Sequence, residues 1–397
     1  MNRIHSIFLY SMLFSLFYSC KELPPAEEFD PSNTHLHVVW KKPFYADSSQ
    51  VVMLSPIVTD RYVALTGTSY SKHENHIVVY DKTNGERSIV WQNGVNCETK
   101  NNITDFLVGG NNKDILLCAT QNSLHAFSIP TGQSLWNVET TTFFVGHPSI
   151  LGNDIIHITS SIDRYNSSTG EKTSLFSFNK GINTMQWAVN SQKDTVFFFL
   201  WGNNDAYCYN LTKNSVVWKN DTLNNGHFGT ATSFHPIIVE NKYVLFQHKM
   251  KISCLDFSTG ELIWEKTTGS TNSCPIFYSE GKIIVRPDKY EDLMSCYDVK
   301  TGNLLWENTD LKLSDDKDLK MDTYKGNLYF ITRRGTAYDC PGFLLCISLA
   351  TGVVNWFDPG PDKGIYENLT IDQQTGFLYC HSRWSVLCID LNKTPKK

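Results

Sequence analysis

The chain has 397 residues, a formal net charge of −5 and a hydrophobic content of 41%. These values are typical of a folded globular protein, and they argue against a long disordered chain and against a basic nucleic-acid-binding surface. The length suits two or three ordinary domains or one large array of repeats, so internal repeats decide between the two architectures.

The N-terminus predicts an exported and lipid-anchored protein. Arg3 precedes the apolar run I-F-L-Y-S-M-L-F-S-L-F-Y, which is too short to span a bilayer, so residues 1–19 are typical of a signal peptide. The stretch L-F-Y-S-C resembles a bacterial lipobox, which implies lipid attachment at Cys20; an ordinary signal peptide followed by an incidental cysteine stays open. Residues 20–34 are acidic and contain prolines, as expected of a tether. We therefore expect one folded domain over residues 35–397.

From residue 35 onward, one sequence pattern recurs. Two or three short β-rich segments precede a T-G turn, and a short strand ending in tryptophan follows the turn. The turn and strand read S-T-G-E-L-I-W at 258–264, T-G-N-L-L-W at 301–306, T-G-Q-S-L-W at 131–136 and T-G-V-V-N-W at 351–356. Short β-rich segments separated by Gly and Asn predict four-stranded antiparallel units.

The aromatic residue after each turn sets the number of units. The anchor residues are 40 to 51 positions apart, a period typical of propeller blades. The fold class predicted is therefore all-β, an eight-bladed β-propeller in which each anchor docks one blade on the next; a seven-bladed ring stays open if the repeat at Phe176 is irregular. The anchors are Trp40, Trp91, Trp136, Phe176, Trp218, Trp264, Trp306 and Trp356.

The two ends of the domain complement each other. The chain finishes with a third-strand segment at 386–391 that has no T-G turn and no tryptophan after it, and it begins with H-L-H-V-V-W at 35–40. We expect the N-terminal strand to complete the last blade and to close the ring, which would remove open sheet edges.

Cysteines recur at one repeat position. Five of the eleven lie inside apparent third strands, which is typical of small buried hydrophobic residues rather than of a disulfide framework. These five are Cys208, Cys254, Cys296, Cys346 and Cys388. A bridge between Cys340 and Cys346 stays open. No C-x-x-C motif occurs, and we expect no metal site.

The phrases C-L-D-F-S-T-G-E-L-I-W and C-Y-D-V-K-T-G-N-L-L-W resemble the tryptophan-docking motif of the pyrroloquinoline-quinone-type (PQQ-like) propeller repeat family. In size, lipobox and compact repeats the chain is similar to the lipoproteins of the outer-membrane β-barrel assembly machinery (BamB type). The resemblance implies a propeller fold and a place in the bacterial cell envelope, and it is weaker for activity.

Catalysis is not expected. The quinone enzymes of this family use a calcium ion, a carboxylate base and often a Cys-Cys pair, and this chain has no Cys-Cys dipeptide. Four acids could line a central funnel, but none pairs at a fixed spacing with a histidine or another acid. They are Asp163, Asp205, Glu291 and Asp292. We expect no cofactor.

The loops that join second and third strands favour a protein-binding role. In three consecutive repeats these loops carry arginines and aromatic residues, a combination enriched at protein interfaces. Because neighbouring repeats are neighbours in a ring, we expect the residues to gather on one partner-binding rim. The rim residues are Arg286, Tyr290, Arg333, Arg334, Tyr338, Arg383 and Trp384. The alternatives are solvated loop charges and the binding of an acidic glycan or a peptide carboxylate by the arginines.

Three functions follow from these features. The first is a monomeric, non-enzymatic scaffold of the outer membrane, periplasmic or surface-facing, that docks other envelope proteins, including the β-barrel assembly machinery. The second is a surface protein that binds glycans or peptides. The third is a PQQ-dependent oxidoreductase. Contact with a membrane is expected only through the lipid, and binding of nucleic acid is not expected.

Overall fold

The structure of the protein is a computed structural model. It describes residues 34–394 apart from the stretches 44–49, 53–54, 70–73, 88–94, 98–102, 111–113, 121–122, 140–147, 159–160, 178–181, 190–193, 202–205, 221–235, 249–250, 268–275, 287–292, 310, 312–319, 334–341, 362–364 and 383–384. Within these ranges all regular structure is β-strand, and the described residues include no helix that is long and apolar enough to cross a membrane. The predicted leader and tether up to residue 33 lie outside the described residues.

The described strands form eight antiparallel sheets. The first contains β2 (Gln50–Val52), β3 (Ile57–Val58), β4 (Tyr62–Ser69), β5 (Glu74–Asp81) and β6 (Val95–Cys97). The second contains β7 (Ile103–Gly109), β8 (Ile115–Thr120), β9 (Ser123–Ser128) and β10 (Ser134–Glu139), and the third β11 (Ser149–Leu151), β12 (Asp154–Ile158), β13 (Ser161–Asn166) and β14 (Lys172–Ser177). The fourth contains β15 (Ile182–Val189), β16 (Thr195–Trp201), β17 (Ala206–Asn210) and β18 (Ser215–Asn220), and the fifth β19 (Ile237–Val239), β20 (Tyr243–His248), β21 (Lys251–Asp256) and β22 (Leu262–Thr267). The sixth contains β23 (Ile276–Ser279), β24 (Lys282–Val285), β25 (Met294–Asp298) and β26 (Leu304–Asn308), and the seventh β27 (Met321–Tyr324), β28 (Asn327–Arg333), β29 (Gly342–Ser348) and β30 (Val354–Asp358). The last sheet contains β31 (Ile365–Asp372), β32 (Phe377–Ser382), β33 (Ser385–Asp390) and β1 (Val38–Pro43).

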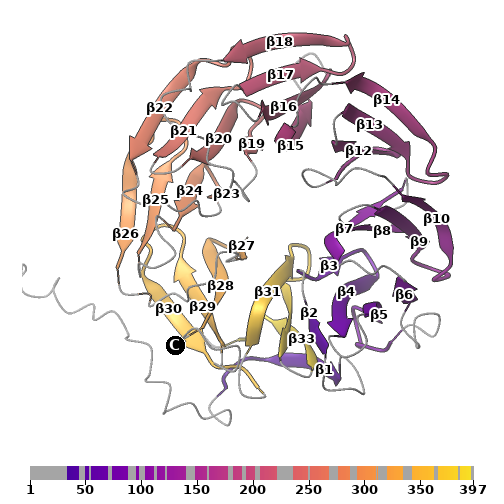
Figure 1. The fold of residues 1–397 in the computed structure, drawn as a ribbon. Coiled ribbons are helices and arrows are strands. Elements are labelled where there is room, and N and C mark those ends of the chain that lie inside the picture. The colour runs from indigo at the N-terminus through magenta and orange to yellow at the C-terminus, as the bar shows by residue number, and fades with distance from the viewer. Residues whose placement is uncertain are drawn as a thin grey trace, which may run out of the picture.

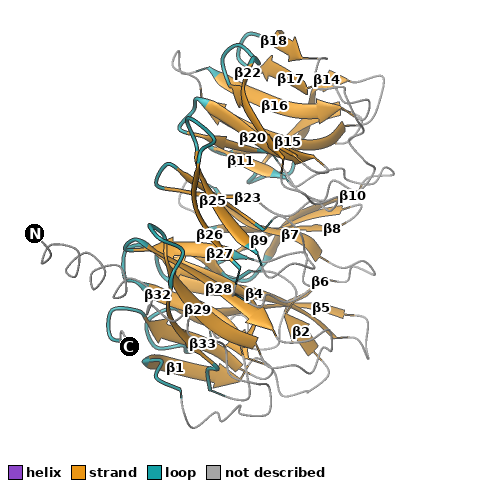
Figure 2. Ribbon diagram, turned by 90° about the vertical axis from the view of Figure 1, so that its left-hand side faces the viewer, coloured by secondary structure: helices purple, strands orange, loops and turns teal. Residues whose placement is uncertain are grey.

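The sheets follow one another around a common centre in chain order, from indigo to yellow (Figure 1). The fourth strands, such as β18, β22 and β26, lie on the outside, and strands such as β23 and β27 lie toward the centre (Figure 1). Figure 2 shows the same sheets from the side, with no helix among the coloured elements. The predicted all-β architecture of four-stranded antiparallel sheets is confirmed.

The N-terminal strand lies in the same sheet as the last three strands. β1 pairs antiparallel with β33, with Trp40 opposite Cys388 and Lys42 opposite Val386. The sheet order β1-β33-β32-β31 therefore joins residues from both ends of the domain.

The first sheet departs from the expected pattern. β2 and β3 both pair with β4, so this sheet has five strands instead of four. Its outer strand β6 has three residues and pairs with β5. Trp91, the anchor expected here, lies outside the described residues.

The outer strands also run further than expected. The sequence pattern predicted a strand ending at tryptophan, but β22 continues for three residues beyond Trp264 and β26 for two beyond Trp306. A shift of register lies next to each tryptophan, because Trp264 is opposite Cys254 while Leu262 is opposite Leu255. Such a bulge increases the local twist of the outer strand.

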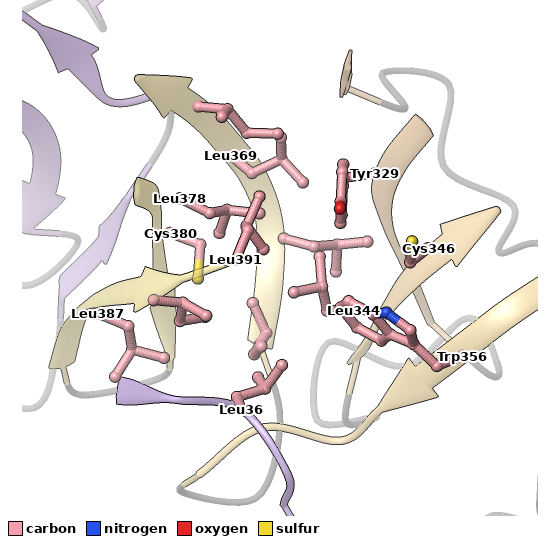
Figure 3. Close-up of a cluster of buried hydrophobic side chains, with 14 residues drawn as sticks. Leu36, Tyr329, Leu344, Cys346, Trp356, Leu369, Leu378, Cys380, Leu387 and Leu391 are labelled. Atoms are coloured by element: carbon pink, nitrogen blue, oxygen red, sulfur yellow. The ribbon is translucent and has the colours of Figure 1, made fainter. Parts of the chain in front are cut away.

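The hydrophobic core lies between successive sheets. One cluster joins the β27–β30 sheet to the last sheet, and Trp356, Leu344, Leu378 and Leu387 belong to it (Figure 3). Leu36, which precedes β1, packs in the same cluster. These two sheets therefore bury the faces that they turn toward each other, as a repeat array requires.

Candidate functional site

The tryptophans form the joints between sheets. In five joints the indole Nε1 donates a hydrogen bond to a backbone carbonyl in a turn of the next sheet, over 2.8–3.1 Å, and the ring is 7–9% exposed. The donor–acceptor pairs are Trp40–Lys82, Trp136–Ser167, Trp218–Phe257, Trp264–Val299 and Trp306–Leu349. A buried indole has one polar atom, and this bond satisfies it without loss of apolar contact.

The glycine of the T-G turn lies directly against the tryptophan ring of the preceding sheet. Gly302 has φ +67°, and a Cβ built there would lie 2.7 Å from Cδ2 of Trp264. Gly352 repeats the arrangement with Trp306, and a Cβ would lie 2.4 Å from Cε3. Glycine is required for both reasons, because other residues resist this backbone conformation and the ring occupies the place of a side chain.

The recurring cysteines lie opposite tryptophans in several sheets. Cys208, Cys254, Cys296 and Cys346 are paired in register with the tryptophans of the fourth strands, and all are buried. Burial raises the pKa of the Cys208 and Cys254 thiols to about 12, so these thiols stay protonated and unreactive near neutral pH. Cys340 lies outside the described residues, so its bridge with Cys346 stays a prediction that the structure leaves untested.

Phe176 occupies the tryptophan position of the third sheet. Its backbone lies opposite Ile162, and the register shifts directly after this pair, as it does beside Trp264. The strand geometry of the repeat is therefore retained where the aromatic residue differs. The side chain of Phe176 lies outside the described residues.

The joint between the last and first sheets has added polar contacts. Nζ of Lys82 lies 2.8 Å from Oδ2 of Asp372, and the two side chains are 10% and 7% exposed. The carbonyl of Lys82 accepts hydrogen bonds from Trp40 Nε1 at 3.0 Å and from Tyr379 Oη at 3.3 Å. Trp40 also stacks on Tyr80, with ring centroids 6.0 Å apart. Burial raises the pKa of the Asp372 carboxyl, but the Lys82 ammonium and other hydrogen bonds outweigh burial and lower it below its usual value.

The residues before β1 are fixed on a neighbouring sheet by one buried carboxylate. Asp358, at the end of β30, is 2% exposed. It accepts hydrogen bonds from Oγ1 of Thr34 at 2.7 Å, from the N–H of His35 at 2.6 Å and from the N–H of Gly360 at 2.7 Å. In the preceding sheet the residue at the same position is Asn308, which instead donates to the carbonyl of Gly352 at 2.7 Å. The acceptor Asp suits this joint because its partners are donors.

In the last sheet, residues from both ends of the domain form the turn that follows the third strand. In the fifth sheet one continuous segment forms this turn. In the fifth sheet, Asp256 N–H donates to Glu261 O, and Gly260 N–H donates to Asp256 O. In the last sheet, Asp390 N–H donates to His37 O at 2.9 Å, and Thr394 N–H donates to Asp390 O at 3.0 Å. We call residues 390–394 with His37 the split turn.

The structure describes one side chain of the predicted arginine rim, and it contradicts the expected position. Arg286 follows β24 and is 3% exposed, so its guanidinium is buried rather than presented to a partner. Arg333 ends β28 opposite Gly342, but its side chain is outside the described set. Tyr290, Arg334, Tyr338, Arg383 and Trp384 also lie outside the described residues.

Of the four acids considered for a funnel, the structure describes Asp163. It is fully buried in β13, and Nζ of Lys172 lies 2.9 Å from its Oδ2. The hydroxyls of Ser161 and Ser174 donate to Oδ1 at 2.8 and 2.7 Å. Burial raises the pKa of Asp163, but these hydrogen bonds and Lys172 lower it overall, so the group is a charged partner inside the sheet. Asp205, Glu291 and Asp292 lie outside the described residues.

Within the described ranges, no group of three or more His, Cys, Asp or Glu side chains could hold a metal ion. The described residues thus form structural joints between neighbouring sheets. Residues 202–359 match the family model described as "Outer membrane protein assembly factor BamB". These residues are therefore similar to the PQQ-like propeller repeats of that family. The resemblance based on the T-G and tryptophan motif is therefore confirmed over this part of the chain.

Two solved structures have a similar fold. The crystal structure of the computationally designed Ika8 protein has a TM-score of 0.64 and 11% identity, over 90% of this chain and 100% of that chain. BamB from Moraxella catarrhalis has a TM-score of 0.57 and 15% identity, over 88% of this chain and 97% of that chain. At these identities the likeness shows the propeller fold alone. No curated protein matches the chain.

Sequence reasoning missed the residues that adapt the joints at the chain ends. Lys82 stands one position after Asp81 in a D-x-x-x-G turn, where three of the other turns carry Phe257, Val299 and Leu349. An ionic residue at an apolar repeat position is the signal that could have predicted a buried partner. Asp358 gave a similar signal, since it lies two residues after a tryptophan where the preceding repeat has Asn308.

Proposed function

We propose that the chain is an exported, non-enzymatic propeller scaffold of the bacterial outer membrane that docks other envelope proteins and takes part in outer-membrane protein assembly. The match of residues 202–359 to the assembly-factor family carries this proposal. The sequence of the leader supports the location, because L-F-Y-S-C at 16–20 resembles a lipobox. In this proposal residues 1–19 are removed, Cys20 carries the lipid, residues 20–34 form the tether and residues 35–397 form the domain.

The scaffold is proposed as a closed ring of eight blades. Support comes from the eight sheets among the described strands and from the pairing of β1 with β33. A ring whose sheets are joined by repeated, buried tryptophans is rigid, so its loops can vary without loss of the fold. This architecture suits a monomeric docking platform.

The partner surface is proposed on the loops after β28 and β32 and before β25. Without the buried Arg286, the rim consists of Tyr290, Arg333, Arg334, Tyr338, Arg383 and Trp384. The change Arg333→Glu with Arg334→Glu should abolish partner capture and leave the melting temperature unchanged, because both residues follow the last core position of β28. Unimpaired capture by this variant would remove the rim from the proposal.

Cells that lack the protein provide the test of the assembly role. Folded outer-membrane β-barrels resist unfolding by detergent at room temperature and migrate differently on gels after heating. We expect the folded fraction of several barrel proteins to fall in the deletion strain and to recover with the wild-type gene. Unchanged barrel levels and folding would exclude the assembly role and favour a surface ligand as the next candidate.

A further inference from the structure

The joint between the third and fourth sheets departs from the other joints at one position of the third strand. In the fifth sheet this position holds Cys254, two residues before Asp256, which begins the turn. In seven of the eight sheets the residue at this position is 0–2% exposed. These residues are Val79, Ala126, Cys208, Cys254, Cys296, Cys346 and Cys388. In the third sheet the position holds Arg164, whose side chain is 44% exposed.

The outer strand of the third sheet also departs from the repeat. In the second, fifth, sixth and seventh sheets, the fourth residue after the turn glycine is a tryptophan that is 7–9% exposed. The fourth residue after Gly170 is Ser174, which is exposed. The aromatic residue of this strand, Phe176, stands two positions further on. A phenyl ring has no N–H, so Phe176 cannot donate the hydrogen bond by which the tryptophans hold the turn of the next sheet.

The turn of the fourth sheet is not built to receive a ring. It reads N-L-T-K-N at 210–214 and contains no glycine. Asn214 stands where the fifth sheet has Gly260, and its φ is +52°. A Cβ at Gly260 would lie 2.5 Å from Cδ2 of Trp218, so the Cβ of Asn214 excludes a ring packed in this way. The tryptophan and the glycine that receives it are therefore replaced together at this joint.

The replacing side chains make contacts inside their own sheets. Nη1 of Arg164 lies 3.9 Å from Oδ2 of Asp154, which also belongs to the third sheet. The hydroxyl of Ser174 donates to a carboxylate of the same sheet at 2.7 Å. In the fourth sheet, the hydroxyl of Tyr209 donates to Oδ1 of Asn214. None of these three contacts joins the third sheet to the fourth.

The joints on either side keep the usual contacts. Nε1 of Trp136 donates to the carbonyl of Ser167 at 2.8 Å, and Nε1 of Trp218 donates to the carbonyl of Phe257 at 2.9 Å. Buried hydrophobic clusters join the second sheet to the third and the fourth sheet to the fifth. The third and fourth sheets are therefore each fixed to the neighbour on their far side.

We propose that the joint between the third and fourth sheets is a hinge, at which the outer parts of the two sheets separate and close again. Arg164 and Ser174 are already exposed to solvent at this joint. Separation there exposes less apolar surface than at a joint sealed by a buried tryptophan, so it costs less free energy. The movement changes the spacing of loops on the two sheets without unfolding either sheet. It does not depend on the proposed docking function.

Distances between spin labels across the joint test the hinge. One pair of labels, on Thr173→Cys and Val217→Cys, spans the neighbouring outer strands β14 and β18 (Figure 1). A matched pair, on Ile263→Cys and Leu305→Cys, spans β22 and β26, and all four native residues are exposed. In double electron–electron resonance, we expect the distance distribution of the first pair to be about twofold broader than that of the second. Equal widths would overturn the proposal.

A second variant installs the missing contact. Ser174→Trp with Asn214→Gly, made in the chain that carries the first pair of labels, should narrow that distribution to the width of the second pair. A folded variant whose distribution stays broad would contradict the assignment of the hinge to the replaced residues. The comparison of the two labelled pairs decides the proposal even where this variant does not fold. The wild type, treated with the label in parallel, gives the background from the protein's own cysteines.

Discussion

Replacement of Gly302 by alanine tests the joint between the fifth and sixth sheets. The methyl group meets two obstacles, a backbone at φ +67° and an indole carbon of Trp264 at 2.7 Å. A left-handed conformation costs about 1–2 kcal/mol for a residue with a Cβ. Overpacking against a ring that is buried and hydrogen-bonded adds about 1–3 kcal/mol. We expect Gly302→Ala to lower the free energy of unfolding by about 2–5 kcal/mol.

Gly281→Ala is the matched control. Gly281 has φ +74°, but a Cβ built there meets nothing within 4 Å, so the substitution should cost about 1–2 kcal/mol from the backbone alone. Equilibrium unfolding in urea, read from the midpoint at unchanged slope, gives both values. The difference between the two variants measures the contact with the indole. An equal loss of unfolding free energy in both variants would refute the idea that the tryptophan ring packs against the T-G glycine.

Three further predictions concern charged groups. Lys82→Met leaves the buried Asp372 carboxylate without its cation and should lower the free energy of unfolding by about 3–5 kcal/mol, measured by thermal or urea unfolding. Lys82→Met combined with Asp372→Leu should recover most of that loss. An equal loss in both variants would contradict the buried ion pair. Burial raises the pKa values of Asp256 and Asp298, but turn hydrogen bonds from Ser258, Thr259, Lys300 and Thr301 outweigh it and lower both. Their contribution to stability is therefore present above about pH 4 and is lost as the pH falls below it, so a melting temperature that is unchanged from pH 5 to pH 3 would be inconsistent with these turns. Asp358→Asn replaces the carboxylate that accepts three hydrogen bonds by an amide. The hydrogen-exchange rate of the His35 amide should therefore rise, and an unchanged rate would contradict this role of Asp358.

The repeat and its joints were predictable because their signals are local. The turn, the glycine and the tryptophan lie within seven residues of each other, and the tryptophan needs only the turn of the next repeat, 35 residues further for Trp264 and Val299. The pairing of β1 with β33 was also predictable, since each end of the domain lacks what the other has.

Contacts that join distant parts of the chain were not predictable in the same way. Asp358 and His35 are 323 residues apart, and Lys82 and Asp372 are 290 apart, so no periodicity relates them. The pairing of both β2 and β3 with β4 was not indicated by the repeat pattern, and the turn of this repeat reads D-K-T-N-G at 81–85, without the T-G pair. The burial of Arg286 was missed because loop position and residue type favour exposure, whereas the packing of the sixth sheet determines the outcome.

The buried joints and the loops between strands have different roles in the proposed function. Buried residues of the repeat, such as Trp264, Cys254 and Val299, stabilise neighbouring sheets. Hydrophobic contact is the main contribution, because each indole loses most of its exposed surface at the joint. The proposed docking function would therefore depend on loop residues, which substitutions can change without disturbing the joints.

A crosslinked pull-down of the tagged protein from its own cell envelope, with captured proteins identified by mass, tests the docking proposal most directly. We predict recovery of components of the β-barrel assembly machinery, with loss of capture in the Arg333→Glu and Arg334→Glu variant at unchanged melting temperature. Recovery of glycan-handling surface proteins in their place, or of no envelope protein at all, would contradict the proposed scaffold in outer-membrane protein assembly.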